Sequence, residues 1–181
     1  MSKHSATRLL AAAILTTIAF VPDSGQAEDA IGVNAFATWN LQGTVVMSAP
    51  DEATLVGSLA GPVFVDSGQG PTYAGQIVCP GTVTIDLKDA SQQGEGVCAF
   101  HAKDGAEAYG RWRCVGYHMV GCKGDFTFTG GSDRLAGVTG GSGLLIRGEL
   151  LEVAKSPGPV AAERAVGIIV WQNLVATLPQ K

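Results

Sequence analysis

Positive charge is scarce in this chain. Its 181 residues include 12 lysines and arginines against 16 aspartates and glutamates. The local basic cluster is limited to Arg111, Arg113 and Lys123, which we expect to form a solvated strand face. Because binding to nucleic acid needs a concentrated basic face that neutralises phosphates, the sequence predicts no nucleic-acid partner.

Standard catalytic and cofactor signatures are also missing. The chain has no G-x-S-x-G, no H-E-x-x-H and no phosphate loop ending in G-K-S or G-K-T. The glycines of 137–143 follow a strand without opening a helix, which argues against a nucleotide site. Two histidines, His101 and His118, lie near cysteines, but no C-x-x-C or H-x-x-x-H spacing joins potential ligands. We therefore expect no cofactor and no metal.

Long apolar runs are absent except for one near the start. Leu9 to Val21 is a 13-residue apolar stretch that follows Lys3 and Arg8 and precedes the small residues Gly25 and Ala27. It is too short to span a bilayer and suits the core of a secretory signal peptide. We expect cleavage after Ala27 and a periplasmic or secreted protein with no membrane span.

Residues 28–181 then form the mature chain, which we expect to be one domain. Removing residues 1–27 takes away Lys3, Arg8 and Asp23, so 10 basic residues face 15 acidic ones. A chain of this size can bury roughly 68–70% of its unfolded surface in a single core.

Four cysteines, Cys79, Cys98, Cys114 and Cys122, lie in the exported part. Disulfides form and persist outside the cytoplasm, so we expect two bridges, for which three pairings are possible. We favour Cys114 with Cys122, because glycines near both ends of the intervening segment could close a hairpin. This choice leaves Cys79 with Cys98.

An alternation of apolar and polar residues with a period of two runs through the mature chain. Such alternation is typical of strands with one buried face. The expected strand segments are 39–47, 55–59, 63–65, 83–87, 97–101, 108–120, 126–128, 144–153 and 166–177. Gly61-Pro62 is expected to break the second apolar region, and 89–96 to form a polar turn. Pro157 and Pro159 are expected to stop the strand before them.

The protein is predicted to be nearly all β. No segment has a sustained apolar stripe of helical period, and Ala161 to Ala165 are expected to form one helical turn at most. About eight to ten short strands with glycine-rich turns suit a closed antiparallel barrel or a β-sandwich. An eight-stranded barrel leaves an interior that side chains fill or that holds one small ligand.

The last predicted strand, 166–177, is apolar on both faces. A strand of this kind is covered by the core on one side and by a neighbouring element or a second subunit on the other. The sequence is therefore compatible with a homo-oligomer formed through this strand, and equally with cover by a neighbouring element.

The run Gly124 to Gly143, GDFTFTGGSDRLAGVTGGSG, resembles the G-x-F-x-x-x-G-G-T-G-x-[FY]-x-G-x-x-G-x-G signature of the allene oxide cyclase and dirigent-like barrels. It is similar to small exported bacterial-type members of that group. It differs at Ser132, where Thr is common, and at Asp133, where Gly is usual; aspartate tolerates left-handed backbone. The resemblance covers about 20 residues and implies an antiparallel eight-stranded barrel with an apolar cavity, in a dimer or trimer. It carries over no catalytic residue.

The first functional hypothesis is a non-enzymatic exported barrel. It would bind a small apolar or aromatic molecule, or act through its surface in an envelope assembly or at a host. The candidate ligand-binding residues are Trp39, Leu41, Phe126, Phe128 and Ile146. The same five residues equally suit a filled core.

The alternative hypothesis is an isomerase or cyclase that acts on an apolar substrate in the cavity. Such an enzyme needs a desolvated polar group among apolar walls. Glu149 is the candidate catalytic residue, with Arg147 on the same strand face as its partner. The competing interpretation of these two residues is an exposed cross-strand pair.

Overall fold

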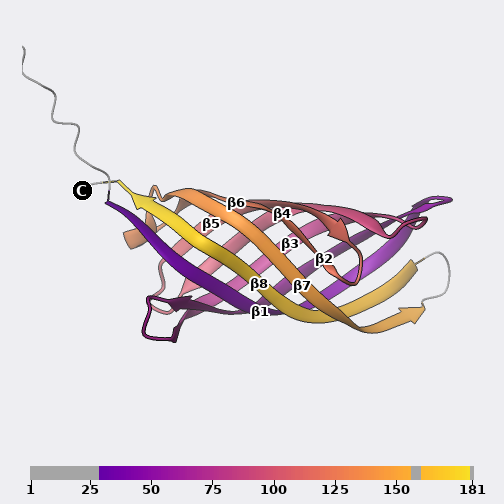
Figure 1. The fold of residues 1–181 in the computed structure, drawn as a ribbon, viewed down its shortest axis with the longest axis horizontal. Coiled ribbons are helices and arrows are strands. Elements are labelled where there is room, and N and C mark those ends of the chain that lie inside the picture. The colour runs from indigo at the N-terminus through magenta and orange to yellow at the C-terminus, as the bar shows by residue number, and fades with distance from the viewer. Residues whose placement is uncertain (1–28, 156–159, 180–181) are drawn as a thin grey trace, which may run out of the picture.

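The fold is a closed antiparallel barrel of eight strands. The structure is a computed structural model that describes residues 29–155 and 160–179. Each strand pairs with the next along the chain, and the last pairs with the first (Figure 1). The strands are β1 (Asp29–Ala49), β2 (Glu52–Asp66), β3 (Pro71–Asp86), β4 (Ser91–Ala102), β5 (Glu107–Tyr117), β6 (Gly121–Gly131), β7 (Thr139–Lys155) and β8 (Val160–Leu178).

This architecture confirms the predicted all-β barrel, and the β-sandwich alternative does not form. A short 3-10 turn, η1 (Asp133–Leu135), joins β6 to β7. Among the described residues no helix is long and apolar enough to cross a membrane. The predicted signal peptide, residues 1–27, and Pro157 and Pro159 lie outside the described residues.

Several strands are longer than the sequence pattern predicted. Gly61-Pro62 does not break β2, since both residues belong to the strand and lie opposite β3, Gly61 with Ile77 and Pro62 with Gln76. The predicted turn at 89–96 is shorter, since β4 already begins at Ser91. Ala161 to Ala165 belong to β8 and form no helical turn.

The barrel interior is filled largely by aromatic rings, aliphatic side chains and sulfur. Trp39, Trp112 and Trp171 are buried in one continuous core. Glycines make room for these rings: a Cβ on Gly81 would overlap the Trp112 indole, and one on Gly148 would overlap that of Trp39. The high glycine content of the chain therefore serves the packing of large rings inside a narrow barrel.

The glycine-rich run after β6 turns as predicted. Asp133, where the resembling family usually has glycine, has φ of +52°. This is the left-handed backbone that the sequence analysis expected aspartate to tolerate. Gly137 has φ of +73°, a conformation that glycine adopts without steric cost.

The barrel has two ends, which we name after the histidine at each. At the His118 end lie the turns 50–51, 87–90 and 118–120. At the His101 end, on the left in Figure 1, lie the turns 67–70 and 103–106 and the β6–β7 connection.

Two disulfides form, Cys79–Cys98 and Cys114–Cys122, which is the pairing that the sequence analysis favoured. The first joins β3 to β4 and the second joins β5 to β6, and both hairpins turn at the His118 end. All four cysteines are buried in the core. Two disulfides indicate that the protein belongs to an oxidising compartment.

Candidate functional site

A cavity lies inside the barrel at the His118 end. Its volume is about 110 Å³. Most of its wall is apolar, and the main apolar side chains that line it are Trp39, Leu41, Leu55, Leu59, Trp112 and Ile146. An engineered apolar cavity of about 150 Å³ holds one benzene ring. The enclosed space here is smaller, but the cavity opens beside the exposed Met119 and Glu149, so it suits a single small ring whose substituent lies towards that opening, or a short chain.

The structure divides the predicted ligand-binding residues into two groups. Trp39, Leu41 and Ile146 line the cavity. Phe126 and Phe128 lie outside its lining and pack edge to face, with ring centroids 5.2 Å apart. Trp39, Leu41 and Ile146 therefore fit the ligand-binding interpretation. Phe126 and Phe128 fit the alternative, a filled core.

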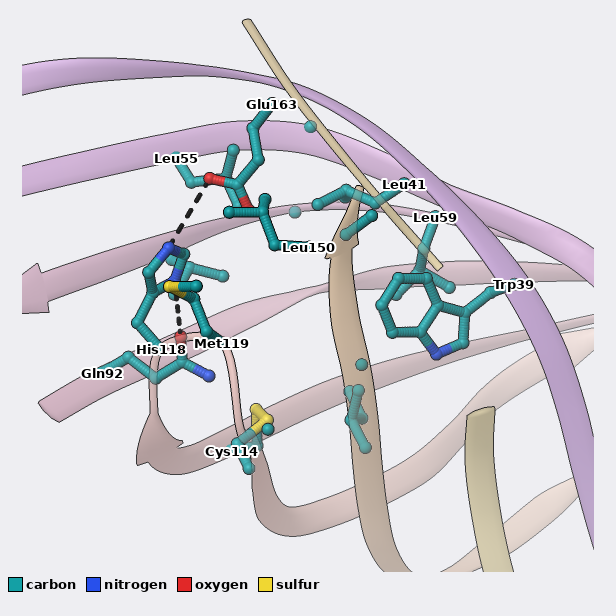
Figure 2. A pocket seen from close by; sticks show the side chains of 18 of the residues that line it. Trp39, Leu41, Leu55, Leu59, Gln92, Cys114, His118, Met119, Leu150 and Glu163 are labelled. Atoms are coloured by element: carbon teal, nitrogen blue, oxygen red, sulfur yellow. Dashed lines mark hydrogen bonds and ion pairs between the residues drawn. A yellow bond between two sulfur atoms is a disulfide. The ribbon is translucent and has the colours of Figure 1, made fainter. Parts of the chain in front are cut away.

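One region of the cavity wall is polar. The His118 Nε2 atom lies 3.6 Å from Glu163 Oε2, and His118 Nδ1 lies 3.4 Å from Gln92 Oε1. Figure 2 shows His118 between the other two side chains, with Leu55 and Leu150 close to the Glu163 carboxyl group. Gln92 comes from β4, His118 from the β5–β6 turn and Glu163 from β8, so closure of the barrel brings together three separate parts of the chain.

The position of Glu163 follows from the strand alternation of β8. Along this strand Glu163, Ala165, Ile169 and Trp171 are buried, whereas Arg164 is exposed. Side chains at every second position point to the same face, which here is the barrel interior. Glu163 is 5% exposed and is the one buried charged residue among those described.

The position of His118 is determined by the β5–β6 turn. Cys114–Cys122 closes this hairpin, and the His118 backbone N–H donates a hydrogen bond to the Ala90 carbonyl oxygen at 2.8 Å. A disulfide and a link to the neighbouring β3–β4 turn therefore hold the histidine over the cavity.

The electrostatics of Glu163 are dominated by burial. Burial raises the pKa of its carboxyl group above the ordinary value, and the nearby His118 partly opposes this increase. No described residue donates a hydrogen bond to this carboxyl group within 3.5 Å. The Glu163 oxygens can therefore accept a hydrogen bond from a bound molecule or exchange a proton with it.

Glu149 and Arg147, the pair singled out from the sequence, are exposed on β7. Glu149 borders the cavity, but its side chain is not desolvated. The pair matches the exposed interpretation, and Glu163 is the buried acid of this cavity.

Sequence reasoning missed Glu163 and Gln92 as site residues and considered His118 for a metal site alone. A signal for Glu163 was present, because the alternation of Ile169 and Trp171 extends backwards through Ala165 to position 163. Because 161–165 was expected to form a helical turn, the strand alternation was not extended to position 163. Within the described ranges 29–155 and 160–179, no three His, Cys, Asp or Glu side chains gather in a metal-binding arrangement.

A second His–Glu pair lies at the other end of the barrel. His101 Nδ1 is 2.9 Å from Glu107 Oε1, and the Tyr109 hydroxyl donates a hydrogen bond to the same carboxylate. Glu107 is half-buried, and its two partners are exposed. The Tyr109 hydrogen bond, followed by His101, lowers the pKa of Glu107 below its ordinary value.

No protein-family model and no curated protein sequence matches this chain. Among solved structures, the chain is similar to the pterocarpan synthase dirigent protein GePTS1. The two are 11% identical with a TM-score of 0.36, over 90% of this chain and 100% of that one. The closed eight-stranded barrel described above follows from the strand pairing of this chain itself.

Proposed function

We propose that this protein binds one small, largely apolar molecule in the cavity at the His118 end. The observation that carries this proposal is an apolar cavity with one polar region, inside a barrel whose interior is otherwise well filled. Ligand sites in proteins commonly combine apolar walls with a few convergent polar groups. The volume of about 110 Å³ favours a molecule of one ring.

The surroundings of the cavity support access by an apolar molecule. Tyr117, Met119 and Val120, in and beside the β5–β6 turn, are 57%, 60% and 57% exposed. Met119 also lines the cavity. An apolar molecule arriving at the His118 end would meet these side chains before it enters the barrel.

Titration calorimetry with benzyl alcohol tests this proposal. A ligand of eight heavy atoms is expected to bind with a Kd of roughly 0.1–1 mM. Ile146→Phe should abolish binding, because the larger ring occupies the cavity that Ile146 lines. Val115→Phe is the matched control, since Val115 is 61% exposed on the outer face of β5. Absence of binding to the wild type, or equal binding to wild type and Ile146→Phe, would contradict the proposal.

A second candidate function is proton transfer in an isomerase or cyclase, and the observation that favours it is the buried Glu163 beside His118. In this role the Glu163 carboxylate takes a proton from a carbon next to a carbonyl group and later returns it, while His118 donates a hydrogen bond to the carbonyl oxygen. Groups with a shifted pKa are frequent at such sites.

Exchange of the α-hydrogens of cyclohexanone in D₂O, followed by NMR, tests this second candidate. Wild-type protein should accelerate exchange over buffer, and Glu163→Gln should not. Equal exchange with both proteins would exclude the role while leaving the binding proposal intact.

We further propose export after cleavage near Ala27 and self-association through the outer face of β8. The two disulfides support export. The outer face of β8 carries Val166, Ile168 and Val170, which are half-buried in the single chain. Native mass spectrometry of the exported protein tests both points, since it gives the mass of the mature chain and the number of subunits.

A further inference from the structure

The charged residues around the cavity are of one sign. The polar residues that line it are Gln92, His118, Glu149 and Glu163. Among the described lining residues there is no lysine and no arginine. Any ligand charge in this cavity therefore meets carboxylates and no permanent positive charge among the residues that line it.

The Glu163 carboxyl group is buried without a full set of partners. Its nearest polar neighbour, His118 Nε2, is 3.6 Å away, longer than the 2.7–2.9 Å of a good charge-assisted hydrogen bond. His118 cannot simply rotate to close this gap without changing its 3.4 Å contact with Gln92. The carboxyl oxygens thus keep acceptor capacity for a molecule in the cavity.

The free-energy cost of removing Glu163 from water is already included in the free energy of folding, because the residue is only 5% exposed in the unliganded protein. A cation that binds beside it gains a charge-assisted hydrogen bond in surroundings of low dielectric constant. It does so without further desolvation of the protein carboxylate, so only the ammonium group of the ligand still loses hydration, whereas in most buried ion pairs both ions do.

We propose that the ligand of this cavity is a small apolar amine, bound as an ammonium ion whose N–H groups donate to Glu163. This inference rests on the proposed function and specifies the chemical class of the ligand. The apolar part, a single ring or a short alkyl chain, lies among Trp39, Leu41 and Ile146. A carboxylate of the same size is disfavoured, because its charge would lie beside that of Glu163 with no lysine or arginine among the lining residues to offset it.

Three ligands with the same ring test the proposal: benzylamine, benzyl alcohol and benzoate, titrated calorimetrically into the mature wild-type protein near neutral pH. We expect benzylamine to bind about tenfold tighter than benzyl alcohol, since hydrogen bonds to charged groups contribute more than neutral ones. Benzoate should bind most weakly.

Variants of Glu163 and Glu107 test whether Glu163 causes the preference for benzylamine. Glu163→Gln should reduce the affinity for benzylamine to about that for benzyl alcohol and should reduce the affinity for the alcohol by a smaller factor, since the amide keeps the shape and an acceptor oxygen but loses the charge. Glu107→Gln, which alters a carboxylate at the opposite end, should leave the order of the three ligands unchanged. Glu163→Asp, which keeps the charge, should retain part of the preference for the amine.

The outcomes separate the two proposals. Equal affinities of the wild type for benzylamine and benzyl alcohol, or tightest binding of benzoate, would overturn the amine inference while the binding function stands. Failure of all three ligands to bind would overturn the binding function itself. The order of the wild-type affinities for the three ligands tests the amine proposal even where a variant folds poorly.

Discussion

The two ends of the barrel each carry a His–Glu pair, and the two pairs differ in almost every physical property. At the His118 end Glu163 is buried and its contact with His118 is 3.6 Å. At the His101 end Glu107 is only half-buried and its contact with His101 is 2.9 Å. The pKa of Glu163 is raised, whereas the pKa of Glu107 is lowered. The surroundings therefore shift the pKa values of the two glutamates in opposite directions.

The cause of this difference is the supply of hydrogen-bond donors. Glu107 accepts hydrogen bonds from Tyr109 and His101 and has access to water, so its charged form is favoured. Glu163 lies among apolar side chains with His118 at a longer distance, so its charged form is penalised (Figure 2). The partly unsatisfied pair is the one that faces a cavity, and it is the pair to which we assign ligand binding.

The two ends of the barrel also differ in their cross-links. Removing a disulfide is the change for which we expect the largest effect on the free energy of unfolding. Both disulfides close hairpins that turn at the His118 end, whereas an Arg134–Asp104 ion pair links loops at the His101 end. Replacing both residues of Cys79–Cys98 by alanine should lower the free energy of unfolding by about 3 kcal/mol in the chain-entropy description. The same change at Cys114–Cys122 should lower it by about 2.5 kcal/mol, because the closed loop is shorter.

Urea unfolding checks the stabilities of the two double variants, and calorimetry checks their ligand binding. We expect the Cys114–Cys122 variant to lose more affinity for benzylamine, because this disulfide closes the turn that holds His118. Greater loss of affinity in the Cys79–Cys98 variant would show that the turn keeps its position without its disulfide.

A second comparison concerns two glycines on β7, one in each half of the barrel. A Cβ on Gly148 would lie 2.7 Å from Trp39 Cη2, whereas the nearest atom to a Cβ on Gly143 is 4.0 Å away. Gly148→Ala should therefore lower the free energy of unfolding by roughly 1–3 kcal/mol through overpacking. Gly143→Ala should change it by less than about 0.5 kcal/mol. Urea unfolding of both variants measures the difference, and equal stabilities would contradict the close fit of Trp39 to the cavity wall.

The all-β class could be predicted because the relevant signals are local, whereas the choice between barrel and sandwich depends on the pairing of β1 with β8, which are far apart in the chain. Alternation with a period of two predicted the strands, and flanking glycines favoured the Cys114–Cys122 pair. The sequence offered five candidate ligand-binding residues that equally suited a filled core, and three of them, Trp39, Leu41 and Ile146, line the cavity. The site itself was not predictable in this way, because Gln92, His118 and Glu163 are far apart in the chain and meet only when β8 closes against β1. Gln92 moreover lay in a segment whose polar composition indicated a turn, although β4 begins just before it.

Glu163 also makes the stability of the protein depend on pH. Because its pKa is raised in the folded protein, the folded state holds this proton more tightly than the unfolded chain. Stability from this group is complete below the ordinary carboxyl pKa and is lost as pH rises through the raised one. Glu163→Gln removes this loss, so the variant should be more stable than wild type at pH 8 and should lose this advantage at pH 4. Thermal unfolding across this range checks the expectation, and an advantage that persists at low pH would contradict it.

The smallest expected effect has the opposite sign and comes from Glu107. Its pKa is lowered in the folded protein by the Tyr109 hydrogen bond and by His101, so its stabilising effect is present above the ordinary carboxyl pKa. That effect is lost as pH falls through the lowered pKa. Glu107→Gln should therefore be slightly less stable than wild type at pH 8 and equal to it in strong acid, the mirror image of Glu163→Gln. Because His101 and Tyr109 are exposed, solvent screens the pair and the change should be small and should shrink further at high salt. Thermal unfolding of both variants in one pH series measures the contrast directly, and the same sign for both would show that burial does not separate the two pairs.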